Sequence, residues 1–452
     1  MMWVCCLFFY LCSSLCYGFE NLSDSEGCII SSLDLPTVLQ RVREYSPALS
    51  IAATEVEMRI SEEQQVGLWP NPVASVEVDG ADSMIVSRKR RGDGEVFYNL
   101  SQEFELGGKR SARQSEAFYR TSLALWDLDS VTLDIEKNAT LAMIDVMAAQ
   151  EYLKVAIEQH HISREMLSNI SLMEEAGRAT ALEIKKAKIG EARAALAVDQ
   201  ARRELETSKK KLCSLWGSLW PDFTEVVYPI FDMDFFPGCY TLEVLQLLQK
   251  RNNPDITRWE IEIAVASKAI ALERANAVPD LTLNAGYVSG GGNSWIFGLS
   301  IPIPIFDRNQ GNISRAQQQL QQLYERREET FIVLGTTLMT AYEEVLAAHR
   351  EATSFKETLL SSANLALESA QDGFSEGKYG YFDLLDAQRT LFELQGEYIA
   401  ALVEYHYKCT AVYRLIGNTS AIPPKDQDCF YPILGRLNLL KEISGTSSHG
   451  KL

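Results

Sequence analysis

Residues 377–388 read Gly377-Lys378-Tyr379-Gly380-Tyr381-Phe382-Asp383-Leu384-Leu385-Asp386-Ala387-Gln388. Two hundred residues earlier a related stretch reads Gly177-Arg178-Ala179-Thr180-Ala181-Leu182-Glu183-Ile184-Lys185-Lys186-Ala187-Lys188. In both stretches a glycine and a basic residue are followed, at matching distances, by an acid and an alanine. The chain therefore repeats this segment, as an internal duplication would.

Apolar residues follow each acid at alternating intervals of three and four positions. In the second stretch they are Leu384, Ala387, Leu391, Leu394, Tyr398, Ala401 and Tyr405, and in the first Ile184, Ala187, Ala194, Val198, Ala201 and Leu205. Glu191 is the one residue that breaks the series. This spacing is the heptad pattern of a coiled coil. It predicts two long helical hairpins, each turning at a glycine-containing tip.

The duplication extends beyond the hairpins. Ser46-Pro47 and Asn253-Pro254 each open a helical stretch, and prolines near residues 70 and 279 close them. Asp34-Leu35-Pro36 predicts a still earlier helix start, with a helix continuing to about Leu68 and an irregular lead-in over residues 19–33. Short alternating segments and a very long helix follow in both halves. The order helix, strand, strand, long helix, tip, helix therefore occurs twice.

This organisation divides the chain into five parts. We expect a signal peptide over residues 1–18, a first repeat over 19–212, an inter-repeat segment over 213–240, a second repeat over 241–417 and a C-terminal segment over 418–452. Prolines and tryptophans interrupt the helical pattern in the inter-repeat segment, which together with the C-terminal segment predicts a small mixed collar around the middle of an elongated molecule.

The start of the chain indicates export. Residues 3–17 are almost wholly apolar, and Cys16-Tyr17-Gly18 places small residues at the positions that signal peptidase requires. The segment departs from the usual form because no Lys or Arg precedes Arg41. Lipidation of Cys16 is the weaker alternative, since Leu15 stands where a small residue normally precedes a modified cysteine. The formal charge of −18 argues against nucleic acid as a partner.

The remaining cysteines do not indicate a metal site. They are Cys28, Cys213, Cys239, Cys409 and Cys429, which are widely spaced and contain no CxxC pair. A disulfide among Cys213, Cys239 and Cys429 is left open. His160 and His161 are adjacent on a helix and are expected at a solvated surface. No combination of nucleophile, base and orienting group is evident, so we expect neither catalysis nor a cofactor.

Residues 73–79, 96–106, 281–287 and 295–301 alternate as strands. Their apolar positions and their aromatic residues near the strand ends fit a membrane-spanning barrel. Their polar positions would face its lumen, and these are Asn99, Ser101, Glu103, Glu105, Thr282 and Asn284. Four strands cannot close a barrel, and an open edge in lipid is costly, so several chains must combine. Three copies would give twelve strands and an open lumen.

The basic residues 88–91 lie between the first two strands and are expected in a solvated turn. The long helices, expected over residues 108–175 and 312–376, would each be on the order of 100 Å long. The apolar stretch 331–342 is too short to span a membrane, so we expect the helices to stand in water with their apolar faces covered by other helices.

Several motifs together resemble the TolC-type outer-membrane efflux proteins. They include Trp69-Pro70-Asn71-Pro72, Leu106-Gly107-Gly108-Lys109-Arg110 and Ile301-Pro302-Ile303-Pro304-Ile305-Phe306-Asp307. The Leu-Gly-Gly-Lys-Arg form is similar to the branch that is paired with heavy-metal cation pumps. The resemblance implies a homotrimer, with a twelve-stranded barrel in the outer membrane and a coiled-coil tunnel in the periplasm. It also implies that a periplasmic membrane-fusion adaptor and an inner-membrane pump open the closed tip, making the trimer a passive exit duct.

The same resemblance assigns residues at the tip. Asp383 and Asp386 match an aspartate pair that lines the periplasmic constriction, where three copies would give six carboxylates. The alternative is that both are ordinary acids near a helix start. Glu183 and Lys186 replace them in the first half. Phe374 and Tyr379 stand where the family often has the polar residues of a closing latch. Adaptor docking is expected at Gly177, Arg178, Gly377 and Lys378.

The main alternative is a soluble periplasmic coiled-coil scaffold or adaptor whose strands form a small sheet. Dependence on detergent and a trimeric state would separate the two. The transported compound, whether a drug or a metal cation, is not readable from this chain, because the inner-membrane partner of such a system selects it.

Overall fold

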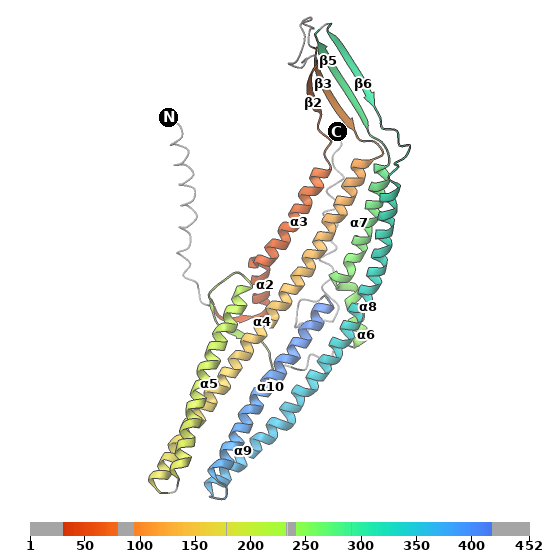
Figure 1. The fold of residues 1–452 in the computed structure, drawn as a ribbon. Coiled ribbons are helices and arrows are strands. Elements are labelled where there is room, and N and C mark those ends of the chain that lie inside the picture. The colour runs from red at the N-terminus through yellow and green to blue at the C-terminus, as the bar shows by residue number, and fades with distance from the viewer. Residues whose placement is uncertain are drawn as a thin grey trace, which may run out of the picture.

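The computed structural model describes residues 30–79, 95–177, 179–231, 233, 241–290 and 292–417. The described chain is long and narrow (Figure 1), with strands at one end and the tips of two helical hairpins at the other. The expected signal peptide, the basic residues 88–91 and the C-terminal segment 418–452 lie outside the described residues, as do most residues between 232 and 240.

The two halves share one order of elements, as an internal duplication would produce. The first half comprises β1 (Ile30–Asp34), α2 (Leu35–Tyr45), α3 (Pro47–Val66), β2 (Val73–Asp79), β3 (Glu95–Phe104), α4 (Lys109–Glu175) and α5 (Ala181–Ser214). The second comprises β4 (Phe223–Val227), α6 (Leu242–Asn252), α7 (Pro254–Asn276), β5 (Leu281–Ser289), β6 (Ser294–Ser300), α8 (Gln310–Ser354), the π-helical turn η1 (Phe355–Leu359), α9 (Leu360–Ser375) and α10 (Tyr381–Leu415).

The helix predicted from residue 34 to residue 68 is in fact two helices. Ser46 is extended, with φ −68° and ψ 121°, because the residue before a proline avoids the helical region. Asn253 before Pro254 has the same conformation and separates α6 from α7. The break is therefore a shared feature of both repeats.

The expected irregular lead-in is also wrong at its end, because residues 30–34 form a strand. β1 pairs in parallel with β4, with Leu33 opposite Val226. Leu33, Val38 and Val42 are fully buried and belong to a core cluster that includes Met143 of α4 and Leu402 of α10. This core lies near the middle of the molecule, so β1 and α2 are held against helices from both repeats.

The four remaining strands form one antiparallel sheet in the order β2-β3-β5-β6. The register places Asn99 opposite Gly286, Ser101 opposite Asn284 and Glu103 opposite Thr282. Neighbours across the ladder point to the same face. The five predicted lumenal residues that lie within these strands therefore share one face of the sheet.

The opposite face of the sheet is apolar. It carries pairs such as Tyr98 with Tyr287 and Leu100 with Ala285, and continues onto β6 through Phe297 and Leu299. Phe297 is 78% exposed in a single chain. The sheet therefore has one polar and one apolar face, and β2 and β6 are its edges.

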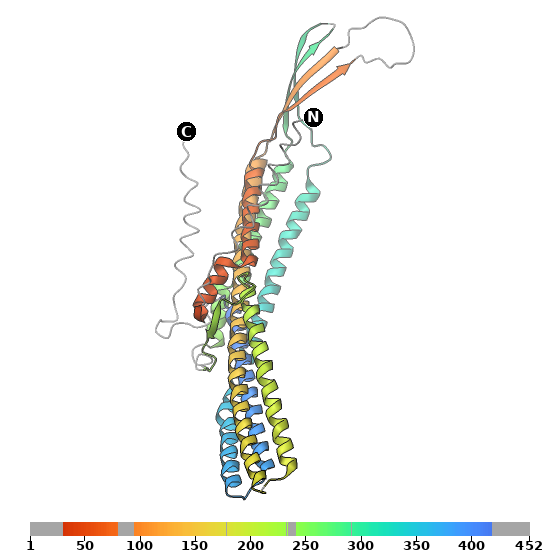
Figure 2. The same cartoon turned by 90° about the vertical axis from the view of Figure 1, so that its left-hand side faces the viewer.

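Below the sheet the helices lie side by side, as two views show (Figures 1 and 2). α4 spans 67 residues, about 100 Å. It packs on α3 and α7 towards the strands, and on α5 and α10 towards the tips. The heptad residues are covered as predicted, since Leu384, Leu391 and Tyr398 are buried on α10 and Ala187, Ala194 and Val198 on α5.

The helix predicted over 312–376 begins at Gln310 and is interrupted by the π-helical turn η1. An extra residue per turn shifts the faces of a helix, so α8 and α9 present different residue series to α10. The run Gln310–Ser375 is long and apolar enough for a membrane span by length and composition, with mean hydropathy 1.3 in a window that is 22% buried. The core helix of a soluble protein can meet the same criteria of length and composition.

Candidate gate and docking surface at the helical tips

The two tips turn at glycines in the left-handed region. Gly177 has φ 71° and Gly377 has φ 73°, a conformation that strains any residue with a Cβ atom. Lys378 follows Gly377 and is exposed, with its Nζ 2.5 Å from Glu376 Oε2. Arg178, the corresponding residue of the first tip, lies outside the described residues.

Each tip leads into a helix that is capped by the duplicated acid. Glu183 Oε2 accepts a hydrogen bond of 2.6 Å from the backbone N–H of Thr180, whose hydroxyl in turn accepts from the Glu183 N–H. Asp383 Oδ2 accepts one of 2.9 Å from the N–H of Gly380. An acid at this position satisfies a free backbone donor at the start of a helix. Capping therefore accounts for the acid in both repeats.

Asp386 has no equivalent acid in the first repeat, where Lys186 stands. Asp383 and Asp386 are both exposed on the first turns of α10. Arg389, one turn further on, is paired with Glu393 at 2.6 Å. Capping explains Asp383, while Asp386 is left as an exposed carboxylate near the tip.

Aromatic residues join the two tips. Tyr381, the first residue of α10, is only 5% exposed and packs in a cluster with Ile170 of α4 and Ala187 of α5. Lys186 Nζ lies 4.0 Å from the ring centre of Phe382. Sequence analysis did not predict this contact, and its one signal is the difference between Tyr381 and Ala181, which stands at the equivalent position of the first tip.

The two residues considered for a closing latch are placed differently. Tyr379 is 52% exposed, and its ring lies against Gly373 of its own hairpin. Phe374 is partly buried between the apolar clusters of the tips. Both depart from the polar residues that the family often has at these positions, so the family's latch is not expected here, and among the described residues neither side chain makes a polar contact.

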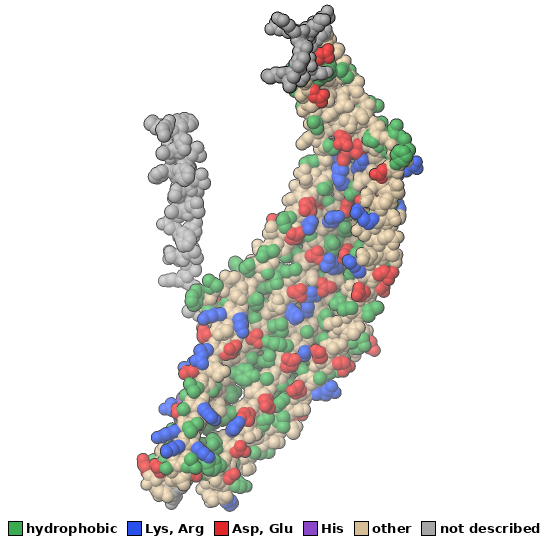
Figure 3. Space-filling view, in the orientation of Figure 1, with side chains coloured by type: hydrophobic (Ala, Val, Ile, Leu, Met, Phe, Trp, Pro, Cys, Tyr) green, Lys and Arg blue, Asp and Glu red, His purple; other side chains and the backbone are tan. Residues whose placement is uncertain are grey.

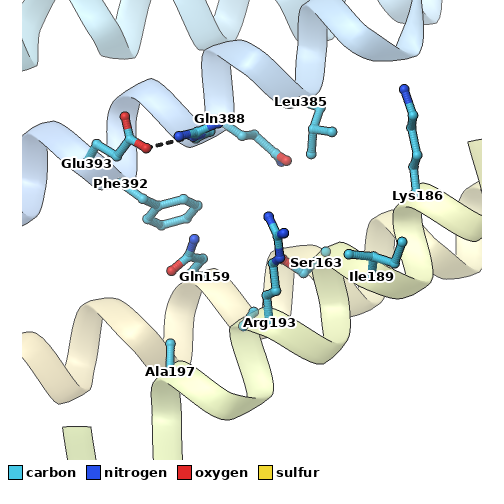
Figure 4. A pocket seen from close by; sticks show the side chains of 13 residues that line it. Gln159, Ser163, Lys186, Ile189, Arg193, Ala197, Leu385, Gln388, Phe392 and Glu393 are labelled. Carbon is cyan, nitrogen blue, oxygen red and sulfur yellow. Dashed lines mark hydrogen bonds and ion pairs between the residues drawn. The ribbon is translucent and has the colours of Figure 1, made fainter. Parts of the chain in front are cut away.

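A groove of about 530 Å³ runs between the hairpins just above the tips. Figure 4 shows Phe392 and Gln388 of α10 facing Arg193 of α5 across it, with Gln159 of α4 at its floor. Figure 3 shows Lys and Arg side chains along the flank that α5 forms. The groove thus combines apolar walls with cationic side chains on one side.

At the other end, charged residues join strands to helices. Glu105 lies just past the end of β3, and its carboxylate accepts two hydrogen bonds from Arg113. It therefore belongs to the strand–helix junction. Lys109, 8% exposed, places Nζ 2.5 Å from Asp280 Oδ2, and Asp280 Oδ1 also accepts from the Leu106 N–H at 3.0 Å. This junction links the two repeats.

Gly107 explains part of the Leu-Gly-Gly-Lys-Arg motif. Its φ is 69°, and a Cβ atom there would lie 2.6 Å from Val278 Cβ. The motif thus packs the start of α4 against the turn before β5.

His160 is less exposed than expected, and the structure also places two of the cysteines. His160 Nε2 lies 3.2 Å from Glu191 Oε1, so one of the two histidines makes a contact between α4 and α5. This contact also explains why Glu191 interrupts the heptad series. Cys213 and Cys409 are buried free thiols, and Cys239 and Cys429, the other two residues considered for a disulfide, lie outside the described residues. The described part of the chain contains no group of His, Cys, Asp or Glu arranged to hold a metal ion.

Comparison with known proteins identifies the family. Residues 245–418 match the family model "Outer membrane efflux protein". The chain is 30% identical over 372 residues to the cobalt-zinc-cadmium resistance protein CzcC of Cupriavidus metallidurans, covering 82% of this chain and 86% of that protein. It is 23% identical to the pyoverdine export outer membrane protein OpmQ of Pseudomonas putida, covering 86% and 83%.

Solved structures show the same fold. The chain matches CusC with a TM-score of 0.70 at 18% identity, covering 88% of this chain and 96% of that chain. It matches the Campylobacter jejuni CmeC outer membrane channel with a TM-score of 0.69 at 18% identity, covering 91% and 89%. The 30% identity to CzcC over most of both chains, together with the matching family model and the shared fold, shows that the chain belongs to the outer membrane efflux protein family.

Proposed function

We propose that three copies of this chain form an exit duct across the outer membrane. The observation that carries this proposal is the sheet, which has one polar face, one apolar face and two edges, β2 and β6. Lipid tolerates an apolar face but not unpaired backbone groups at an edge. Pairing β6 of one copy with β2 of the next provides hydrogen-bond partners for the backbone groups at both edges. Three copies then close a ring around the polar face.

The lumen would be lined by Asn99, Ser101, Glu103, Thr282 and Asn284, while Glu105 would contribute to the rim below them. The helices would continue the ring as a tunnel in the periplasm. The tips would then be the part of the duct farthest from the membrane. We assign adaptor docking to Gly177, Arg178, Gly377 and Lys378, through which a periplasmic membrane-fusion adaptor and an inner-membrane pump would engage the duct.

Asp386, together with Asp383, would form the constriction. Both carboxylates are exposed near the tip of each chain, and threefold symmetry would gather six of them. A ring of carboxylates attracts cations and repels anions. Because Asp383 also caps α10, Asp386 would carry the larger part of the selectivity.

Metal cations are the cargo that we propose. The similarity to proteins named for cobalt-zinc-cadmium resistance and for nickel-cobalt-cadmium resistance supports this choice, and a cation-attracting constriction is compatible with it. The similarity to a pyoverdine export protein makes pyoverdine the competing cargo.

Conductance of the purified trimer in planar bilayers tests the proposal. We expect small, cation-selective currents from the wild type, and larger, less selective currents from the Asp383→Asn/Asp386→Asn double variant. Asp386→Asn alone should produce most of the loss of selectivity. Glu204→Gln, at an exposed position on α5 far from the tip, is the matched control and should change neither quantity. Wild-type currents with unchanged selectivity in the double variant would remove the gate and keep the duct.

A further inference from the structure

The tips of the two hairpins of one chain meet through an apolar contact. Tyr381 begins α10, yet its ring packs against α4 and α5 of the other hairpin, where Ile170 is 2% and Ala187 4% exposed. Met166, Leu167 and Ile184 complete the socket from the same two helices. A side chain of the second tip is therefore inserted into the first.

A second contact flanks this one. Lys186 of α5 lies over the ring of Phe382, the residue next to Tyr381, at 4.0 Å. A cation over an aromatic face contributes little at an exposed site. Phe382 is 44% exposed, so the buried Tyr381 is the main contact and Lys186 an auxiliary one.

The duplication shows that this contact is particular to the second tip. The residues equivalent to Tyr381 and Phe382 are Ala181 and Leu182, and both are exposed in the chain, Leu182 by 58%. The socket on the first hairpin thus has a partner within the chain, whereas neither Ala181 nor Leu182 of the first tip is buried against the second hairpin. Shared helix capping, by contrast, is present in both tips.

We propose that Tyr381 is a positioning residue that holds the two tips of one chain together in the resting duct. This inference rests on the proposed function, because the separation of the tips then sets the width of the constriction beside Asp386. Opening the tip would withdraw the Tyr381 ring from between Ile170 and Ala187. The two tips would therefore be held together by the buried ring of Tyr381, in place of a polar contact between them.

Single-channel recording of full-length trimers tests the inference. Tyr381→Ala should raise the open fraction, or the mean conductance, by at least about tenfold, because removing a buried aromatic side chain shifts such an equilibrium strongly. Tyr381→Phe keeps the ring and should behave like the wild type. Tyr379→Ala is the matched control, since it removes a half-exposed tyrosine of the same tip whose ring lies against Gly373 of its own hairpin.

A second variant, on the opposite side of the contact, distinguishes loss of the contact from misfolding of the Tyr381→Ala protein. Ala187→Leu fills the socket from α5 and should expel the ring, giving a similar rise in conductance. Trimers on gels without denaturation establish that each variant is assembled.

The outcomes separate the two proposals. If no protein conducts, including the Asp383→Asn/Asp386→Asn variant, the proposed duct fails. If that variant conducts while both Tyr381→Ala and Ala187→Leu match Tyr379→Ala, the duct stands and the Tyr381 latch is refuted.

Discussion

Replacing Asp280 with alanine tests whether the junction between barrel and helices depends on a buried ion pair. The side chain of Lys109 is 10% exposed and that of Asp280 is 20% exposed. The substitution leaves the Lys109 ammonium without its carboxylate and the Leu106 N–H without its acceptor. Removing one partner of a buried pair costs about 3–5 kcal/mol. Because water reaches part of Asp280, we expect a loss near the lower end, about 3 kcal/mol per chain.

The assay is urea unfolding of trimers in detergent, followed by circular dichroism. Glu62→Ala is the control, because it removes a surface partner of Arg59, whose side chain is 37% exposed, and should cost at most about 1 kcal/mol. The double variant Lys109→Met/Asp280→Leu should recover most of the lost stability, since apolar residues replace the whole pair. The reasoning is refuted if Asp280→Ala costs no more than Glu62→Ala.

Three further predictions concern the helices. Gly377→Ala should destabilise the second tip by about 1–2 kcal/mol, because the φ of Gly377 is 73°. Gly335→Ala should instead stabilise α8, because alanine favours a helix more than glycine does and a Cβ atom there meets open space. Hydrogen exchange at the two sites measures both effects. The side chain of Arg414 is 12% exposed and forms ion pairs with Asp134 at 2.6 Å and with Asp255 at 3.0 Å. Arg414→Met should therefore lower the free energy of unfolding in urea by about 3 kcal/mol, and Arg414→Lys should lower it less. Burial raises the pKa of Cys213 to about 11 and that of Cys409 to about 12. Stability from these thiols should be constant below pH ~8.5 and fall above it, where only the unfolded thiols ionise, and Cys213→Ala/Cys409→Ala should flatten that alkaline slope.

Local patterns were sufficient for the repeated architecture. The heptads ending at Tyr405 and Leu205 indicate which face of each helix is covered, and the glycines at 177 and 377 indicate where the backbone must turn. Alternation within residues 96–104 likewise placed the polar and apolar faces of the sheet. Each of these patterns involves residues that are only a few positions apart in the sequence.

Contacts between distant segments were not readable in this way. The pairing of β1 with β4 joins residues about 190 positions apart, and no local periodicity marks residues 30–34 as a strand. Glu191 looked like a flaw in a heptad because its partner, His160, lies on another helix. Tyr381 looked like the first residue of a helix, and only the packing of the hairpins shows that it is buried.

The two edges of the sheet also bear on the genetics of the protein. A chain whose β2 or β6 edge is damaged still offers its other edge, and so is built into rings alongside intact chains. If damaged and intact chains are made in equal amounts and mix freely, only about one ring in eight contains three intact copies. Alleles that alter a sheet edge should therefore be dominant over the wild type, while alleles that prevent the chain from folding should be recessive.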